Sequence, residues 1–152
     1  MRIYAAYDDG IRIVDPATGA VESRLSGQRV ECLSVANAAP DGGDADGPGG
    51  SAPRVLAGTF GAGLFRSVDG GERFTRAAAS TLGPDGAGPE AVTAVATSPH
   101  DPAGVWIGTE PSRVYRSADG GETVERVGGL TDLPSAAEWS FPPRPDTHHV
   151  RW

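Results

Sequence analysis

The sequence predicts an all-β fold built from repeated four-stranded antiparallel units, and three observations predict it. A motif recurs at an offset of fifty positions, as RSVDGGERF from Arg66 to Phe74 and as RSADGGETV from Arg116 to Val124. Short runs rich in Val, Ile, Tyr, Phe and Trp flank both copies and are bounded by Gly, Pro and Asp, which is the pattern of strands and turns. Glycine (22 residues) and proline (13 residues) are frequent, which predicts many turns and no long helices.

Each repeated unit is expected to contain four short strands. In the last complete unit they are Val92–Thr97, Val105–Thr109, Val114–Ser117 and Thr123–Val127. Four antiparallel strands repeated every 40–50 residues or so are typical of a β-propeller blade. The predicted fold is therefore a partial β-propeller of four-stranded blades. The chain holds about three blades' worth of strands and does not close the ring alone.

The units form one predicted domain, residues 1–152, with four parts. These are strands of one blade (2–27), a blade with a disordered insertion at 38–53 (30–79), a further blade (91–128) and an orphan inner strand (147–152). The insertion is rich in Gly, Asp and Pro and too polar to pack. Because known propellers contain about four to eight blades, two explanations stay open. Either blades are missing from a longer chain, or the chain associates with itself, with 147–152 supplying the missing inner strand.

Both copies of the repeated motif fall at the turn between the third and fourth strands of a unit. The Asp carboxylate and the Ser hydroxyl can hydrogen-bond to the turn backbone, and the paired glycines allow positive φ. The aromatic ring of Phe74 can seal the turn against a neighbouring blade. The residues with this predicted structural role are Ser67, Asp69, Gly71, Phe74, Ser117, Asp119, Gly121 and Thr123.

These two turns resemble the Asp-boxes of the BNR-repeat propellers, a superfamily that includes sialidases, sortilin-type receptors and a photosystem II assembly factor. The usual box reads Ser-x-Asp-x-Gly-x-Thr-Trp. The first copy has Arg73-Phe74 in place of Thr-Trp, and the second keeps Thr123 but has Val124 at the aromatic position. The resemblance covers residues 54–127, and it implies that the boxes are structural.

Composition limits the classes of partner. The net charge is −7, so the chain lacks the basic stripe that phosphate binding needs, and no nucleic-acid partner is expected. All 13 cationic residues are Arg, and this acidic, Lys-free composition fits either codon bias in a GC-rich genome or a salt-loving host. Cys32 is the sole cysteine and is expected to be a small buried hydrophobe. No run of residues is apolar enough to span a membrane, so we expect a cytoplasmic protein without a cofactor or a metal site.

The candidate ligand residues lie at the end of the units opposite the boxes, where the fourth-to-first and second-to-third connections meet. The segment from Gly128 to Thr147 concentrates aromatic and charged side chains there. Arg144 can hold a carboxylate or a phosphate, and Asp146 can orient His148 or His149 as an acid–base pair. The alternative is that FPPRP is a rigid surface turn. The candidate residues are Trp139, Arg144, Asp146, His148, His149, Arg113 and Glu110.

The function expected from these residues is that of a non-catalytic binding or scaffold module. Its partners would be itself, the missing blades, or a small-molecule, glycan or protein ligand. The resemblance implies an alternative, a sialidase-like glycoside hydrolase or a fragment of one. Such enzymes use an Arg triad, a Tyr–Glu nucleophile pair and an acid/base Asp. The tyrosines here are Tyr4, Tyr7 and Tyr115, and Tyr115 lies next to a box, so no catalytic residues are assigned.

Overall fold

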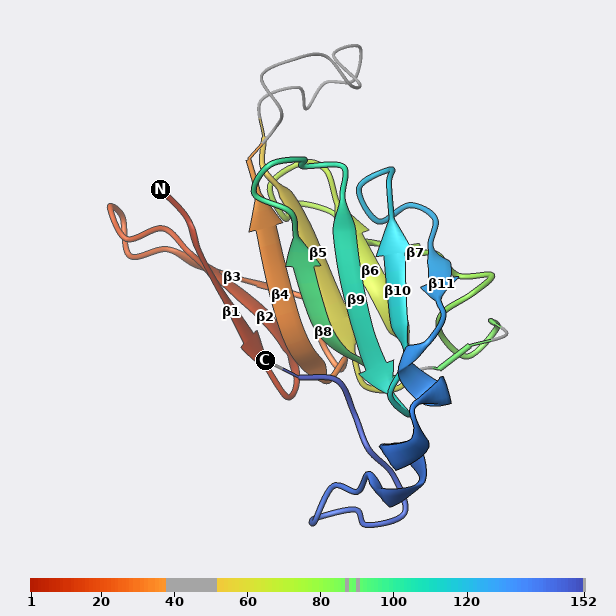
Figure 1. Cartoon of the computed structure of the whole chain (residues 1–152). Helices are drawn as coiled ribbons and strands as arrows, with labels where there is room; N and C mark the ends of the chain where they lie inside the picture. Colours follow the sequence, from red (N-terminus) through yellow and green to blue (C-terminus); the bar gives the residue numbers. More distant parts are fainter. Residues whose placement is uncertain (38–51, 87, 90, 152) are drawn as a thin grey trace.

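The computed structural model describes residues 1–37, 52–86, 88–89 and 91–151. In these residues nearly all regular structure is β-strand (Figure 1). The strands form three antiparallel sheets of three, four and four strands, so the predicted all-β class is confirmed. Two short 3-10 helices follow the last strand, η1 (Leu130–Asp132) and η2 (Pro134–Glu138). The insertion predicted at 38–53 lies outside the described residues, except for 52 and 53.

The first sheet has three strands in the order β1-β2-β3. They are β1 (Ile3–Tyr7), β2 (Gly10–Val14) and β3 (Val21–Arg24). A tight turn joins β1 to β2, with Tyr7 opposite Gly10. The φ of 141° at Gly10 suits glycine and few other residues. Among the described residues no strand pairs with the other edge of β1, so that edge is open to another strand.

The second and third sheets each have four strands and share one pattern of pairing. The second contains β4 (Val30–Ala36), β5 (Arg54–Thr59), β6 (Gly63–Ser67) and β7 (Thr75–Ala77). The third contains β8 (Ala91–Thr97), β9 (Val105–Glu110), β10 (Val114–Ser117) and β11 (Glu125–Val127). Val55 pairs with Ser67, and fifty positions on Val105 pairs with Ser117. Both sheets also carry a bulge near the start of the first strand.

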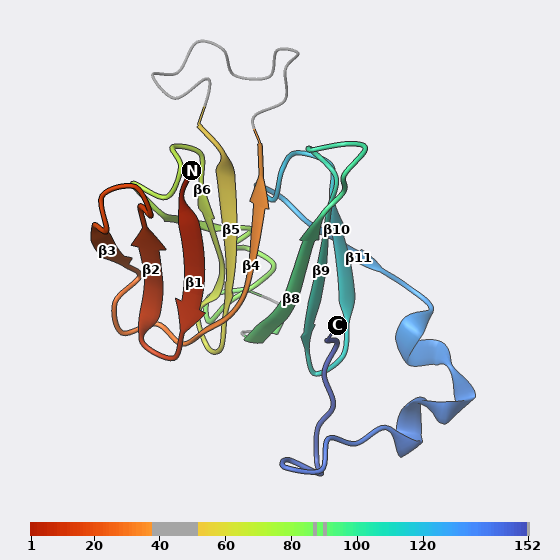
Figure 2. The same ribbon diagram turned by 90° about the vertical axis from the view of Figure 1, so that its left-hand side faces the viewer.

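Two apolar clusters join the sheets face to face. Ile11, Ile13, Val30 and Ala57 pack between the first and second sheets. A larger cluster, which includes Leu56, Leu64, Val92, Val105 and Ile107, packs between the second and third. Figure 2 accordingly shows the second sheet standing between the other two. The sequence alternation along each strand explains this arrangement, because successive side chains point to opposite faces.

The connections between strands gather at two opposite ends of the sheets (Figure 1). The turns β2–β3, β6–β7 and β10–β11 lie at one end, which we call the turn end. The turns β1–β2, β5–β6 and β9–β10 lie at the other, the loop end, together with the starts of β4 and β8. After β11 the chain extends beyond the loop end and returns to the third sheet, where the Val150 N–H donates to the Thr109 carbonyl at 3.1 Å.

Several predicted strand bounds differ from the structure. β8 begins at Ala91 and β9 ends at Glu110, each one residue beyond the predicted run. The last strand begins at Glu125 rather than at Thr123, because Thr123 is hydrogen-bonded into the preceding turn. The orphan strand predicted at 147–152 is not assigned as a strand over the described residues 147–151. A single backbone hydrogen bond, from Val150, joins this described segment to a strand, which is too little pairing for a ladder.

Candidate functional site

The first repeated turn, Ser67 to Phe74, is closed by its own side chains. The Ser67 hydroxyl donates to Asp69 Oδ1 at 2.8 Å and accepts the Gly71 N–H at 2.8 Å. Asp69 Oδ1 also accepts the Arg73 N–H at 3.0 Å. Burial raises the pKa of the Asp69 carboxyl, but these hydrogen bonds outweigh it and lower the pKa below its ordinary value. Phe74 packs against the cluster between the first two sheets.

The second repeated turn uses the same bonds. The Ser117 hydroxyl donates to Asp119 Oδ1 at 2.7 Å and accepts the Gly121 N–H at 2.8 Å. The Thr123 N–H donates to Asp119 Oδ1 at 2.9 Å, and the Thr123 hydroxyl donates to Oδ2. Burial again raises the pKa of Asp119, but the bonds from Ser117 and Thr123 prevail and lower it to about 2. The carboxylate is fully used by its own turn.

Each repeated turn docks on the sheet that precedes it. The Gly70 carbonyl accepts the Tyr4 hydroxyl of the first sheet at 2.9 Å. The Gly120 carbonyl accepts Nε of Arg66 in the second sheet at 3.2 Å. The backbone conformations match, with φ of 72° at Gly70 and 73° at Gly120. The turns therefore fasten neighbouring sheets, and the Ser and Asp side chains of both motifs are used within their own turns.

A cavity of about 340 Å³ opens at the loop end, between the starts of β4 and β8 and the returning chain. Its lining brings together three arginines, two glutamates and a histidine from segments far apart in the sequence. Aromatic and small side chains complete the wall. The lining residues are Arg29, Glu31, Thr93, Glu110, Phe141, Pro143, Arg144, His149 and Arg151.

One side of this loop-end cavity is organised by Glu110. Its side chain is only 7% exposed, and Oε2 accepts Nη2 of Arg144 at 2.8 Å. Oε2 also lies 3.6 Å from His149 Nδ1, which is beyond hydrogen-bond distance. His149 Nδ1 is buried and has no hydrogen-bond partner. The His149 ring contacts Phe141 edge to face, with 4.4 Å between ring centroids. The Glu110 carboxylate is therefore the acidic group nearest to this nitrogen.

The other side is organised by Glu31, whose side chain is 9% exposed. It pairs with Arg29 at 2.7 Å and with Arg151 at 3.0 Å. Thr93 also lines the cavity, and its hydroxyl donates to the Val150 carbonyl at 2.8 Å. This bond fixes the returning chain, which carries Arg151, against β8. Arg29 Nε also lies 3.9 Å from Asp8 Oδ1, so three carboxylates lie beside the three guanidinium groups of the cavity.

Phe60 connects the two sides. The Arg29 guanidinium lies 5.0 Å from the centre of its ring, and that of Arg144 lies 4.8 Å away. Cation–π contacts at these distances orient a guanidinium without using its hydrogen-bond donors. The remaining N–H groups stay available to a ligand.

The bulges at the starts of β4 and β8 explain why these side chains point to the cavity. The register shifts between Val30 and Cys32 in β4, and between Val92 and Ala94 in β8. The extra residues are Glu31 and Thr93, both in the cavity lining. A bulge releases one residue from the alternation and aims its side chain differently. The repeat of the bulge therefore places one polar side chain per sheet at the loop end.

The structure divides the predicted ligand residues between two cavities. Glu110, Arg144 and His149 line the cavity described above. Trp139 and His148 line a neighbouring cavity of about 570 Å³, and His149 lines both cavities. There Trp139 contacts the His148 ring edge to face at 5.4 Å. The adjacent histidines thus face different neighbours, as expected for consecutive residues of an extended segment.

Asp146 and Arg113 stand apart from both cavities. Asp146 is exposed, and in the described part of the chain no hydrogen bond joins it to His148 or to His149. The predicted acid–base pair is therefore not formed. Arg113 contributes its backbone carbonyl, which accepts the Thr109 N–H at 3.1 Å in the β9–β10 turn. Neither side chain is among those that line the loop-end cavity.

Six cavity residues were not predicted from the sequence, and they share a location at strand ends or on the returning chain. A polar residue inside each apolar strand run, Glu31 in β4 and Thr93 in β8, was the available signal, but a bulge cannot be read from a run such as VECLSVA. The residues are Arg29, Glu31, Thr93, Phe141, Pro143 and Arg151.

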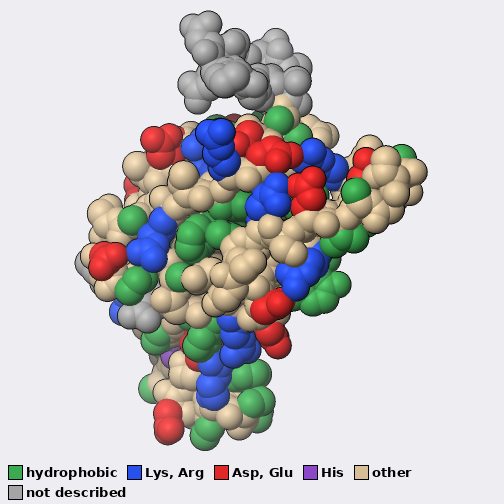
Figure 3. Space-filling model, turned by 180° about the vertical axis from the view of Figure 1, so that it is seen from behind, with side chains coloured by type: hydrophobic (Ala, Val, Ile, Leu, Met, Phe, Trp, Pro, Cys, Tyr) green, Lys and Arg blue, Asp and Glu red, His purple; other side chains and the backbone are tan. Residues whose placement is uncertain are grey.

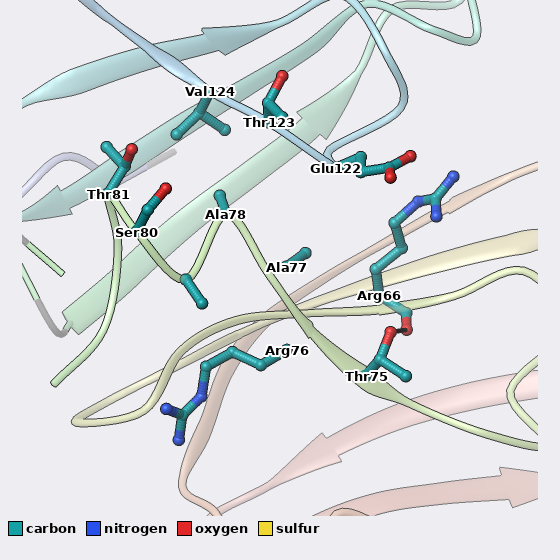
Figure 4. Close-up of a pocket in the computed structure, with 11 residues that line it drawn as sticks. Arg66, Thr75, Arg76, Ala77, Ala78, Ser80, Thr81, Glu122, Thr123 and Val124 are labelled. Atoms are coloured by element: carbon teal, nitrogen blue, oxygen red, sulfur yellow. Dashed lines mark hydrogen bonds between the residues drawn. The ribbon is translucent and has the colours of Figure 1, made fainter. Parts of the chain in front are cut away.

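A further cavity, of about 450 Å³, lies between β7 and the second repeated turn (Figure 4). Its two arginines already have partners. Arg76 pairs with Asp85 at 3.0 Å, and Arg66 donates to the Gly120 carbonyl. We therefore regard it as a gap between packed sheets rather than a ligand site.

Figure 3 shows basic and acidic side chains interspersed over the back of the molecule, without a broad basic stripe on that face. In the described ranges, no group of three His, Cys, Asp or Glu side chains is placed to hold a metal ion. No helix in the same ranges is long and apolar enough to cross a membrane. Comparison of the chain with protein-family models and with curated proteins found no match.

Proposed function

We propose that the chain is a binding module whose loop-end cavity takes a small ligand through a carboxylate group. The observation that carries the proposal is the convergence of Arg29, Arg144 and Arg151 on one cavity in a chain of net charge −7. Guanidinium groups bind carboxylates through two parallel hydrogen bonds, which gives both strength and orientation. His149 also lines the site, with its ring against Phe141.

We further propose that the three sheets are consecutive blades of an Asp-box propeller. The support is the repetition of one turn structure at Ser67–Phe74 and Ser117–Val124, with the same hydrogen bonds from Ser and Asp. Each turn docks on the preceding sheet in the same way. In such an arrangement β4 and β8 would be inner strands, and the cavity would lie at the mouth of the channel, where propeller ligands usually bind.

The proposed site can be tested with matched ligands. Isothermal titration calorimetry would compare glucuronic acid and N-acetylneuraminic acid with their methyl esters, which keep the sugar but lose the negative charge. We expect the acids to bind and the esters to bind at least about tenfold more weakly, because a charged hydrogen bond contributes about 1.5–3 kcal/mol. Equal binding of acid and ester, or binding of neither, would contradict the proposal.

Protein variants locate the binding site. Arg144→Ala and Arg151→Ala are expected to abolish measurable binding of the acids. Arg126→Ala is the control, since Arg126 is exposed, bonds to Thr131 and lies outside the cavity. Circular dichroism would verify that each variant is folded at the temperature of the titration. Retention of full affinity by Arg144→Ala would place the ligand elsewhere.

A second candidate function is that of a sialidase-like glycoside hydrolase, and one observation favours it. Two carboxylates, Glu31 and Glu110, line the same cavity as three arginines. The tyrosines argue against it. Tyr115 is 2% exposed in the core, Tyr4 bonds to Gly70 at the turn end, and Tyr7 does not line the cavity. Turnover of an aryl sialoside that disappears in Arg144→Ala would favour the enzyme; saturable binding without turnover would favour the binding module.

A further inference from the structure

The interface between sheets is built twice in this chain by the same contacts. In the first interface, a Cβ at Gly71 would lie 2.6 Å from Cδ1 of Ile13, so the turn of the second sheet rests directly on the first. In the second interface, a Cβ at Gly121 would lie 2.9 Å from Cδ2 of Leu56, so the turn of the third sheet rests on the second. A sheet face covered by the glycine turn of the next sheet is thus a repeating feature.

The outward face of the third sheet has the same construction but no sheet on it. Leu56 pairs with Arg66 across β5 and β6, and Trp106 pairs with Arg116 across β9 and β10 at the same register. Leu56 is 0% exposed because the third sheet covers it, whereas Trp106 is 44% exposed. The equivalent position is buried in the second sheet, so an exposed Trp at this position in the third sheet indicates an interaction surface.

The outward face of the first sheet is the counterpart of this surface. Tyr7 pairs with Gly10 at the β1–β2 turn as Thr59 pairs with Gly63 at the β5–β6 turn. Counting back four residues from each turn, Ile3 in the first sheet is equivalent to Val55 in the second. Val55 and Thr59 are 0% exposed in the second sheet. Ile3 is 47% exposed and Tyr7 is 52% exposed. The chain therefore leaves open one copy of each side of its own repeated interface.

The chain that returns after β11 makes, on the third sheet, the contact that β8 makes on the second. A Cβ at Gly58 would lie 2.6 Å from Cγ1 of Val92, which belongs to the first strand of the next sheet. A Cβ at Gly108 would likewise lie 2.6 Å from Cγ1 of Val150. Val150 thus sits where the first strand of a following sheet would sit. Among the described sheets, the first has three strands and the other two have four. It lacks a strand equivalent to β4 and β8, and such a strand would pair with the open edge of β1.

We propose that a second copy of this chain docks head to tail on the first. The outward face of the third sheet of one copy packs on the outward face of the first sheet of the other. The segment 147–151 of the first copy runs along the open edge of β1 in the second, as an added strand does on an exposed sheet edge. Two-fold symmetry forms the same interface twice and closes the assembly at six sheets.

The turn end supplies a polar contact for this interface. Arg66 donates to the carbonyl of Gly120 in the turn that covers it, and Arg116 is its exposed equivalent in the third sheet. In the assembly Arg116 faces the turn Asp15–Gly19 of the second copy. A Cβ at Gly19 would have no neighbour within 4 Å in the single chain, so this turn has space to approach a partner.

Sedimentation velocity tests the assembly directly. The native chain is expected to sediment with about twice the mass of one 15.6 kDa chain. Trp106→Glu and Ile3→Glu are each expected to sediment as single chains. Both side chains are exposed in the single chain, so circular dichroism should show unchanged folding. Val68→Glu is the control, because Val68 is similarly exposed at 52% but belongs to a turn of the second sheet.

Mixing the two variants distinguishes head-to-tail docking from other contacts. The Ile3→Glu chain keeps a native third-sheet face, and the Trp106→Glu chain keeps a native first-sheet face. One intact interface can therefore form in the mixture, and we expect two-chain particles to reappear. A native chain of single-chain mass overturns the proposal. So does an Ile3→Glu variant that remains a dimer, since Trp106 faces would then pair with each other.

Discussion

The turn end and the loop end of the sheets hold their carboxylates in opposite ways. At the turn end, Asp69 and Asp119 accept hydrogen bonds from residues no more than four positions away. At the loop end, Glu110 is buried and Glu31 is partly buried, and they pair with arginines that include residues 34 and 120 positions away, respectively. One kind of carboxylate closes a local turn, and the other depends on the complete fold.

The two ends therefore differ in how their charges are held. A turn that satisfies its own donors and acceptors can be repeated wherever the architecture needs it, and it stabilises each sheet on the sheet before it. In the described residues, the loop-end cluster is assembled from the starts of two strands, the end of a third and the returning chain. Its opposite charges are close together in a partly buried site, an arrangement typical of ligand sites rather than of the general surface.

The largest effect is expected at the turn end, from Gly71→Ala. Gly71 has a φ of 90°, and the new Cβ would lie 2.6 Å from Cδ1 of the buried Ile13 and 3.1 Å from Cε1 of Tyr4. Backbone strain and the displacement of Ile13 together should lower the free energy of unfolding by about 2–3 kcal/mol. Urea denaturation followed by circular dichroism measures the change.

Gly129→Ala is the matched control for this prediction. Gly129 also has positive φ, 92°, but a Cβ there would have no neighbour within 4 Å. This variant should lower the free energy of unfolding by about 1 kcal/mol, because backbone strain is its only contribution. If the two variants were equally stable, the turn at Gly71 would not be fastening the first two sheets together.

At the loop end, Arg144→Ala is expected to lower the free energy of unfolding by about 1–2 kcal/mol. The substitution leaves the Glu110 carboxylate, 7% exposed, without its nearest cation. The cost is moderate because the Arg144 side chain is itself 40% exposed. The double variant Arg144→Ala/Glu110→Gln should recover part of the loss, since the amide is neutral. Thermal unfolding of the native chain, the two single variants and the double variant measures the coupling energy between Arg144 and Glu110. Strictly additive changes in the free energy of unfolding would mean that the two side chains do not interact.

The turn end was largely predictable from the sequence because its interactions are local. The spacing of Ser67, Asp69 and Gly71, repeated fifty positions later, encodes the hydrogen bonds without reference to other segments. The strand runs were equally readable, because apolar alternation bounded by Gly and Pro determines them. The start of β11 was misplaced, since Thr123 belongs to the turn.

The loop end was predictable in part. Arg144, His149 and Glu110 were predicted to lie near a ligand because aromatic and charged side chains are concentrated around the β9–β10 turn and the returning chain. Glu31 lies inside an apolar run and is turned toward the cavity by a bulge, which sequence periodicity does not reveal. Asp146 was expected to orient a histidine and is instead exposed, because the direction of side chains in an irregular segment depends on tertiary contacts.

The smallest effect is expected from acid titration at the turn end. The pKa of Asp119 in the folded chain is about 2, below the ordinary value of 3.8. A lowered folded-state pKa stabilises the protein above the unfolded-state pKa, and this stabilisation is lost as the pH falls from 3.8 toward 2. Because Asp119 is exposed, screening by solvent should limit the contribution to less than about 1 kcal/mol.

The variant Asp119→Asn isolates this titration, because an amide cannot ionise. Its unfolding midpoint in urea should therefore vary less between these pH values than that of the native chain. Asp8→Asn is the control, because it removes a carboxylate that is 97% exposed and should leave the native pH dependence unchanged. An Asp119→Asn profile parallel to the native one would show that this turn does not depend on a charged acceptor.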